Sequence, residues 1–189
     1  MKYKNLQVKV EYNFLLLVCL LVILSSCCKN QKFIKHEIDN VLISLPESFV
    51  IKKEPAEDSQ VFSINVGDKC LGYICYGDYK AFEENSFFIT DDKDLYEKYK
   101  SRELKAYFSK NPETDSKNGI FNDNYYYYDT INKHRAQIML PKKANKGSIG
   151  IHFDSVDIHK NKMAIIVTDL SEENKELFLK VFKTIKINP

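Results

Sequence analysis

The pattern of apolar and polar residues predicts three β-strands between residues 41 and 76. The segment 61–66 has an apolar side chain at every second position, which is typical of a strand with one buried face. The segment 70–76 is apolar on both faces and therefore suits a central strand. Pro46 ends the first of these strands. The three strands are 41–45, which residues 49–52 could continue after a kink, 61–66 and 70–76.

Two segments predict helices. Residues 91–110 begin with acidic side chains, continue with good helix formers and are followed by Asn111-Pro112. Residues 111–124 are rich in turn formers, so we expect a loop there. Ser171 is a favourable N-cap for the second helix, and an apolar stripe follows it at helical spacing. That stripe consists of Leu177, Phe178, Val181 and Phe182.

Two hairpins and a short last strand at 184–187 complete the expected fold. Asn132-Lys133 has the length of a tight hairpin turn. Because hairpins outnumber βαβ units, we predict one α+β domain over residues 40–189. It would contain a largely antiparallel sheet of about seven strands packed with two helices. The hairpin strands are 125–131 with 134–140, and 149–158 with 163–168.

The first 26 residues predict a signal peptide rather than an element of the fold. Three lysines precede an apolar run over residues 14–24, and small residues follow the run. A helix needs roughly 20 apolar residues to cross a bilayer, so the run is too short for a permanent transmembrane anchor. We therefore expect residues 1–26 to be removed.

Leu24-Ser25-Ser26-Cys27, at the end of the apolar run, resembles the lipobox of bacterial lipoproteins. The resemblance implies that Cys27 becomes the N-terminus and carries palmitate or similar acyl chains, which attach the chain to a membrane. Cys28 fits less well, because Ser25 stands where an aliphatic residue is expected. The alternative is a plain secretory peptide. Residues 27–39 are polar with little periodicity and predict a lipidated N-terminus with a short tether.

The mature chain carries no excess charge. Without residues 1–26 it has 25 basic (28 − 3) and 25 acidic (26 − 1) side chains. A nucleic-acid-binding domain would have a basic excess, so we expect no nucleic-acid partner.

The cysteines of the domain predict free thiols. Cys70 and Cys75 are five positions apart in one expected strand, which places them on opposite faces and about 16 Å apart. Whether Cys28, Cys70 or Cys75 forms any disulfide stays open at this stage.

Ile43-Ser44-Leu45-Pro46-Glu47, the late hairpin, and the last helix followed by Phe182-Lys183-Thr184-Ile185-Lys186-Ile187 resemble the PsbP-like α/β/α sandwich fold. The resemblance covers most of the mature chain and implies a fold. Since members of this fold have unrelated functions, it implies no activity.

His152 and Asp154 are the one pair that suggests chemistry. They share one face of an expected strand and could bind a divalent metal ion or act as a base with its orienting carboxylate. The competing interpretation is a solvated outer face, because Ile149, Ile151 and Phe153 point the other way.

Four consecutive tyrosines offer a second candidate. Alternation places Tyr125 and Tyr127 on one face of their strand and Tyr126 and Tyr128 on the other. One pair could pack in the fold while Tyr125 and Tyr127 form a stacking surface for a ligand. Ordinary sheet packing is the alternative.

The chain lacks the motifs GxSxG, HExxH and SxxK and any glycine-rich phosphate loop. We therefore expect a non-enzymatic, lipid-anchored protein of the cell envelope, without a cofactor, whose partners are the membrane and another envelope protein. The outer membrane is favoured over the inner because Cys28, rather than an acidic residue, follows Cys27. The alternative is a small envelope hydrolase or metal-binding protein that uses His152 and Asp154.

Overall fold

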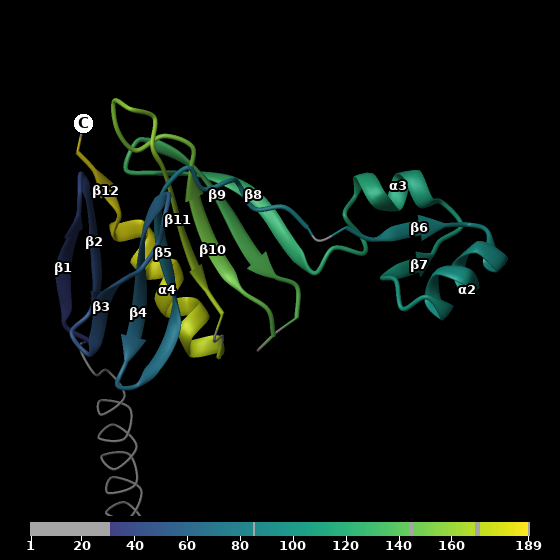
Figure 1. Ribbon diagram of the computed structural model, residues 1–189, viewed down its shortest axis with the longest axis horizontal. Coiled ribbons are helices and arrows are strands. Elements are labelled where there is room, and N and C mark those ends of the chain that lie inside the picture. Colours follow the sequence, from purple (N-terminus) through teal and green to yellow (C-terminus); the bar gives the residue numbers. More distant parts are fainter. Residues whose placement is uncertain (1–30, 85, 144–145, 169–170, 189) are drawn as a thin grey trace, which may run out of the picture. The chain divides into compact units, whose positions relative to one another are not determined.

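A seven-stranded antiparallel sheet forms the centre of the fold in a computed structural model that describes residues 31–84, 86–143, 146–168 and 171–188 (Figure 1). The strand order is β3-β4-β5-β11-β10-β9-β8, and every neighbouring pair is antiparallel. The predicted signal peptide and Cys27 lie outside the described residues. The strands are β3 (Phe49–Glu54), β4 (Ser59–Val66), β5 (Lys69–Gly77), β8 (Asn124–Ile131), β9 (His134–Pro141), β10 (Ile149–Phe153) and β11 (Lys162–Val167).

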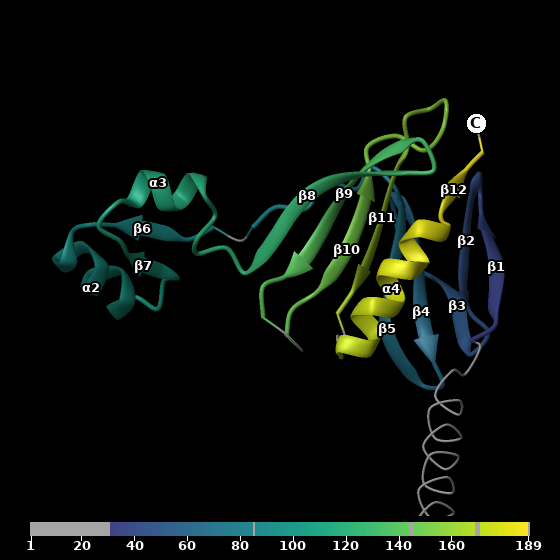
Figure 2. The same ribbon diagram turned by 180° about the vertical axis from the view of Figure 1, so that it is seen from behind.

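One face of this sheet, called here the inner face, packs against helix α4 (Glu172–Thr184). The helix lies behind the strands in Figure 1 and in front of them in Figure 2. Ser171 caps it as predicted, since its hydroxyl accepts a hydrogen bond from the Asn174 amide at 3.1 Å. Phe178, Val181 and Phe182 are fully buried against inner-face residues such as Ile151. The core therefore includes the interface between α4 and the sheet, and buried side chains from residues 38–45 complete it.

A separate three-stranded sheet follows the order β1-β2-β12, with antiparallel pairing throughout. Its first strand corrects the expected tether, because residues 33–38 pair along their whole length with β2. Five of these six residues are not buried, so no apolar periodicity marked the strand. The strands are β1 (Phe33–Ile38), β2 (Val41–Pro46) and β12 (Lys186–Ile187).

The helix predicted over residues 91–110 is wrong beyond its middle. Helix α2 ends at Ser101, because Glu103 takes a φ of 58° and the amides of Arg102 and Leu104 turn back onto the Tyr99 carbonyl. Residues 106–108 then form a strand parallel to residues 88–90. A further short helix lies in the expected loop. The four elements are β6 (Phe88–Thr90), α2 (Lys93–Ser101), β7 (Ala106–Phe108) and α3 (Pro112–Lys117).

A β-bulge in β5 corrects the expected placement of the cysteines. The register shifts so that Cys70 lies opposite Asn65 while Cys75 lies opposite Val61. Asn65 and Val61 are four positions apart on β4, so the two cysteines share one face rather than opposite faces. Both are free thiols, as predicted, and burial raises the pKa of Cys75.

The observed fold confirms the predicted α+β class with a largely antiparallel sheet of seven strands, although the described residues contain three helices rather than two. The tight hairpin between β8 and β9 is also confirmed, with φ of 46° at Asn132 and 76° at Lys133. The PsbP-like assignment stays a prediction.

Within the described part of the chain, no helix is long and apolar enough to cross a membrane.

Asp157 joins three parts of the chain at one end of the sheet. Its carboxylate accepts hydrogen bonds from the Tyr76 hydroxyl at 2.6 Å and from the Asn161 side chain at 2.7 Å. The Tyr76 hydroxyl also lies 3.1 Å from the side-chain oxygen of Asn40, in the turn between β1 and β2, and Asn40 donates to the Asn188 carbonyl. The hydrogen bond from Tyr76, with those from Asn161, holds the pKa of Asp157 at about 2.

This network predicts acid sensitivity. The pKa of Asp157 is lower in the folded than in the unfolded chain, so its contribution to stability is complete above about pH 4 and is lost as the pH falls towards 2. We expect Asp157→Asn to lower stability at neutral pH and to flatten the pH dependence of the unfolding free energy below pH 4. Urea unfolding at several pH values measures both, and an unchanged slope between pH 4 and pH 2 would contradict the assignment.

The interface between α4 and the sheet predicts a large effect for one truncation. Phe178→Ala should lower the free energy of unfolding by about 3–5 kcal/mol, because it leaves a cavity at a fully buried site. Lys180→Ala, on the exposed side of the same helix, is the matched control and should change it by less than about 0.5 kcal/mol. Equal losses in denaturant unfolding would show that α4 is not held by this stripe.

Candidate functional site

The other face of the seven-stranded sheet, the outer face, is covered in part by residues 78–84, called here the strap. Gln137 of β9 fixes the strap with two hydrogen bonds, since its side-chain oxygen accepts from the Phe82 amide at 2.7 Å and its nitrogen donates to the Phe82 carbonyl at 3.1 Å. The Phe82 ring lies against Gly150, where a β-carbon would come within 2.6 Å of the ring. The absence of a side chain at Gly150 therefore leaves room for the Phe82 ring of the strap.

His152 lies under the strap, which corrects the expectation of a solvated outer face at this position. Its side chain is 1% exposed, its Nε2 lies 2.8 Å from the Tyr79 carbonyl oxygen, and the Phe82 ring meets it edge-on. Asp154 is exposed, and one of its oxygens lies 3.6 Å from His152 Nδ1. The structure therefore brings the two predicted residues near each other, but the imidazole is buried and bound to the strap.

In the part of the chain that the structure describes, no third ligand joins His152 and Asp154. Among the described residues, no group of three or more histidine, cysteine, aspartate or glutamate side chains is placed to hold a metal ion. The geometry around His152 fits a residue that holds the strap in place.

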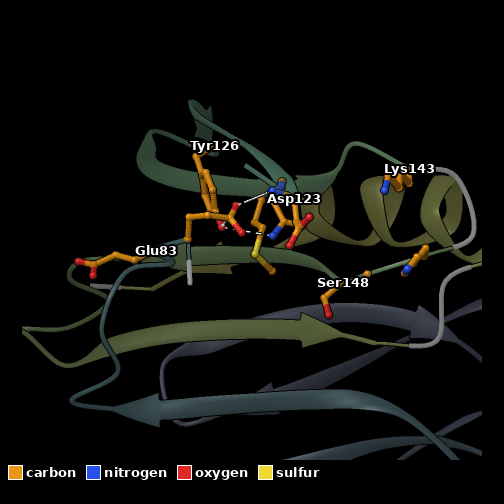
Figure 3. A pocket seen from close by; sticks show the side chains of 10 residues that line it. Glu83, Asp123, Tyr126, Lys143 and Ser148 are labelled. Atoms are coloured by element: carbon orange, nitrogen blue, oxygen red, sulfur yellow. Dashed lines mark hydrogen bonds between the residues drawn. The ribbon is translucent and has the colours of Figure 1, made fainter. Parts of the chain in front are cut away.

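A cavity of about 420 Å³ lies where the strap meets the start of β8 (Figure 3). One oxygen of Glu84 accepts hydrogen bonds from the amides of Asp123 and Asn124 at 3.0 and 3.2 Å and from the Tyr126 hydroxyl at 3.3 Å. Lys105 pairs with Asp123 at 2.6 Å, which lowers the pKa of Asp123. Glu84 therefore holds the strap to the start of β8, and Asp123 binds Lys105 of the segment that follows the strap.

The four tyrosines of β8 divide as predicted between the two faces. Tyr126 packs on the outer face against the cluster around Phe82, and burial raises its pKa. Tyr125 and Tyr127, the predicted stacking pair, lie on the inner-face side and are 57% and 41% exposed. Tyr128 is 52% exposed, with the Arg135 guanidinium 3.8 Å from its ring centre. The candidate surface is thus exposed at the edge of the sheet.

Residues 86–122 form a second candidate surface, called here the aromatic lobe. It contains β6, α2, β7 and α3, and Thr90 and Ser109 are its only buried residues, although the structure describes every residue of this range. All of its apolar side chains are therefore partly or fully exposed. The most exposed are Phe88 (45%), Leu104 (41%), Phe108 (36%) and Ile120 (55%).

The lobe holds itself together with aromatic contacts on both faces of its two strands. Phe88 stacks on Tyr99 of α2 with ring centres 4.4 Å apart. On the opposite face, Tyr107 stacks on Phe121 at 4.6 Å and meets Phe87 edge-on at 5.4 Å. Large exposed apolar patches are common at interaction surfaces.

Sequence reasoning missed the lobe because its residues also fit another pattern. Leu104, Tyr107 and Phe108 also fit the apolar spacing of a helix, so the pattern of residues 91–110 favours one long helix. The positive φ at Glu103 has no signal in the sequence, since glutamate rarely takes it.

Comparison of the chain with protein-family models, with curated proteins and with solved structures finds no match.

The strap generates a testable prediction. Gln137→Ala leaves the buried amide and carbonyl of Phe82 without their partner, which should loosen the strap by about 1–3 kcal/mol. Hydrogen exchange at the Phe82 amide should accelerate accordingly, while the core strand β10 keeps its protection. Thr130→Ala, at an exposed position of β8, is the control. Unchanged exchange at Phe82 would mean that Gln137 does not hold the strap.

Proposed function

We propose that this protein is a lipid-anchored, non-enzymatic binding module of the bacterial cell envelope, and that the aromatic lobe recognises another envelope protein. The observation that carries the proposal is the absence of any buried apolar side chain across residues 86–122. A partner that covers Phe88, Phe108 and their neighbours would supply the apolar burial that the lobe does not achieve alone.

The lipobox supports the location. Cys27 is six residues before Phe33, where β1 begins, so an extended linker of this length reaches at most about 20 Å. A lipid on Cys27 would therefore keep the domain close to the membrane surface. We place it at the outer membrane, because the residue after Cys27 is not acidic.

The burial of His152 weighs against the alternative of a hydrolase or metal-binding site. A catalytic base must reach a substrate, yet the Nε2 atom of His152 is engaged with the Tyr79 carbonyl beneath the strap. Its partner Asp154 faces solvent without a further ligand among the described residues.

The anchor predicts a defined modification. Mass spectrometry of protein from the membrane fraction should find an N-terminal peptide that begins at Cys27 and carries acyl chains. Cys27→Ala should leave the signal peptide attached and the chain without lipid, whereas the neighbouring Cys28→Ala should retain the lipid. An unmodified chain that begins elsewhere would contradict the anchor, although it would leave the lobe open to test.

The lobe predicts a position-dependent contact. We expect a photoreactive phenylalanine analogue at Phe88 to form a discrete adduct with another envelope protein in intact cells, since Phe88 is 45% exposed in the lobe. The same analogue at Ile158, which is 84% exposed in the loop between β10 and β11, is the control and should give no such adduct.

A second variant checks that the adduct reports binding. Ile120→Ser and Leu104→Ser together should remove the Phe88 adduct and leave the amount of protein unchanged, because neither side chain is buried. Equal adducts at Phe88 and Ile158, or none at Phe88, would refute the recognition role of the lobe.

A further inference from the structure

The two edges of the seven-stranded sheet differ in how they are protected against pairing. The β3 edge carries Lys52 and Lys53, and charged side chains, lysine above all, discourage the addition of another strand. The β8 edge has eight residues with neither lysine nor proline, and its register with β9 runs without a bulge. Its residues are Asn124, Tyr125, Tyr126, Tyr127, Tyr128, Asp129, Thr130 and Ile131.

Alternate backbone groups of β8 point away from β9. A two-residue hairpin makes Ile131 and His134 a hydrogen-bonded pair, so odd-numbered residues of β8 bond to β9 and even-numbered residues face outward. Two hydrogen bonds agree with this parity, since the Asn124 amide donates to Glu84 and the Thr130 amide to the Asp129 carboxylate. Between them, Tyr126 and Tyr128 direct their amides and carbonyls outward, and no described strand pairs with that edge.

We infer that the β8 edge pairs antiparallel with the β8 edge of a second copy of this chain. The outward residues 124, 126, 128 and 130 are centred on Tyr127. A two-fold axis at Tyr127 therefore pairs every outward residue of one strand with an outward residue of the other. Tyr126 lies opposite Tyr128 of the second copy on both sides of the axis, which gives four backbone hydrogen bonds by the geometry of antiparallel pairs.

The side chains favour this self-pairing over an unrelated strand. In this register each Asp129 carboxylate lies opposite a Tyr125 side chain of the second copy, so the phenol can donate to the carboxylate and no like charges meet. The two Tyr127 side chains lie opposite each other on the axis, and both are exposed in the single chain. Tyr125 and Tyr127, predicted from the sequence as a ligand surface, are thus assigned to contact between copies.

This contact lies outside the aromatic lobe and does not depend on the proposed function. The pairing joins two seven-stranded sheets into one continuous sheet. Anchoring in one membrane would raise the effective concentration of the two copies, which helps a contact made by a few hydrogen bonds.

Cysteine cross-linking in the full chain tests the register. In a background of Cys28→Ser and Cys70→Ser, Tyr127→Cys should form a disulfide-linked dimer under mild oxidation, because opposite residues of this pair type have Cα atoms about 4.5 Å apart. Asp129→Cys is the matched control, since its two copies would be about 13 Å apart along the strands and should not link. Co-expressed Tyr125→Cys and Asp129→Cys chains should link to each other.

The outcomes distinguish a second copy of this chain from a different protein at the β8 edge. A Tyr127 dimer with the expected heterodimer supports the inference. Links of equal yield at 127 and 129, no link at all, or a 127 adduct with a different protein would overturn it. The test is repeated with Cys27→Ser added to the background, because an unlipidated Cys27 thiol would itself cross-link. Failure of the lipid anchor or of the lobe then leaves the result interpretable.

A charge substitution provides the second measurement. Tyr127→Lys places two ammonium groups opposite each other at the axis and should weaken dimerisation of the detergent-solubilised full chain by about tenfold in sedimentation equilibrium. Tyr125→Lys places an ammonium group opposite Asp129 of the second copy and should preserve the dimer. A wild-type chain that stays monomeric at high concentration, or equal effects of the two substitutions, would contradict pairing at this edge.

Discussion

Burial of the apolar stripe of α4 against the inner face of the seven-stranded sheet is the interaction on which the other features depend. Phe178, Val181 and Phe182 are buried there with the isoleucines of β10 and β11. Helix α4 lies on the inner face only, so another segment has to cover the outer face. The strap, which belongs to the connection between β5 and β8, covers it in part and contacts Gln137, His152 and Gly150.

The same connection carries the aromatic lobe. After the strap, the chain makes two three-residue strands and two short helices, which are too small to enclose a core of their own. Stacked rings and polar contacts such as the one between Ser109 and Asp115 hold this segment, while its large apolar side chains remain exposed. A sheet whose strands are hydrogen-bonded without interruption thus supports a segment with exposed apolar side chains.

The sequence was informative wherever one face of an element is buried. Strands β2 to β5 and β8 to β11 and helix α4 were predicted because burial imposes a period of two or 3.6 on their residues. Strand β1 was missed because its residues are mostly exposed on both faces, and the bulge in β5 has no apolar signature. The environment of His152 could not be predicted, since the strap reaches it from 73 positions away in the chain.

The central claim is that the aromatic lobe becomes covered by a partner where the protein resides. Hydrogen exchange measured on the full chain in its native membranes and on the purified chain in detergent tests this directly. The amides of β6 and β7 should exchange more slowly in the membranes, while those of β10, in the core, should exchange alike in both. Equal exchange of β6 and β7 in the two preparations would contradict the claim.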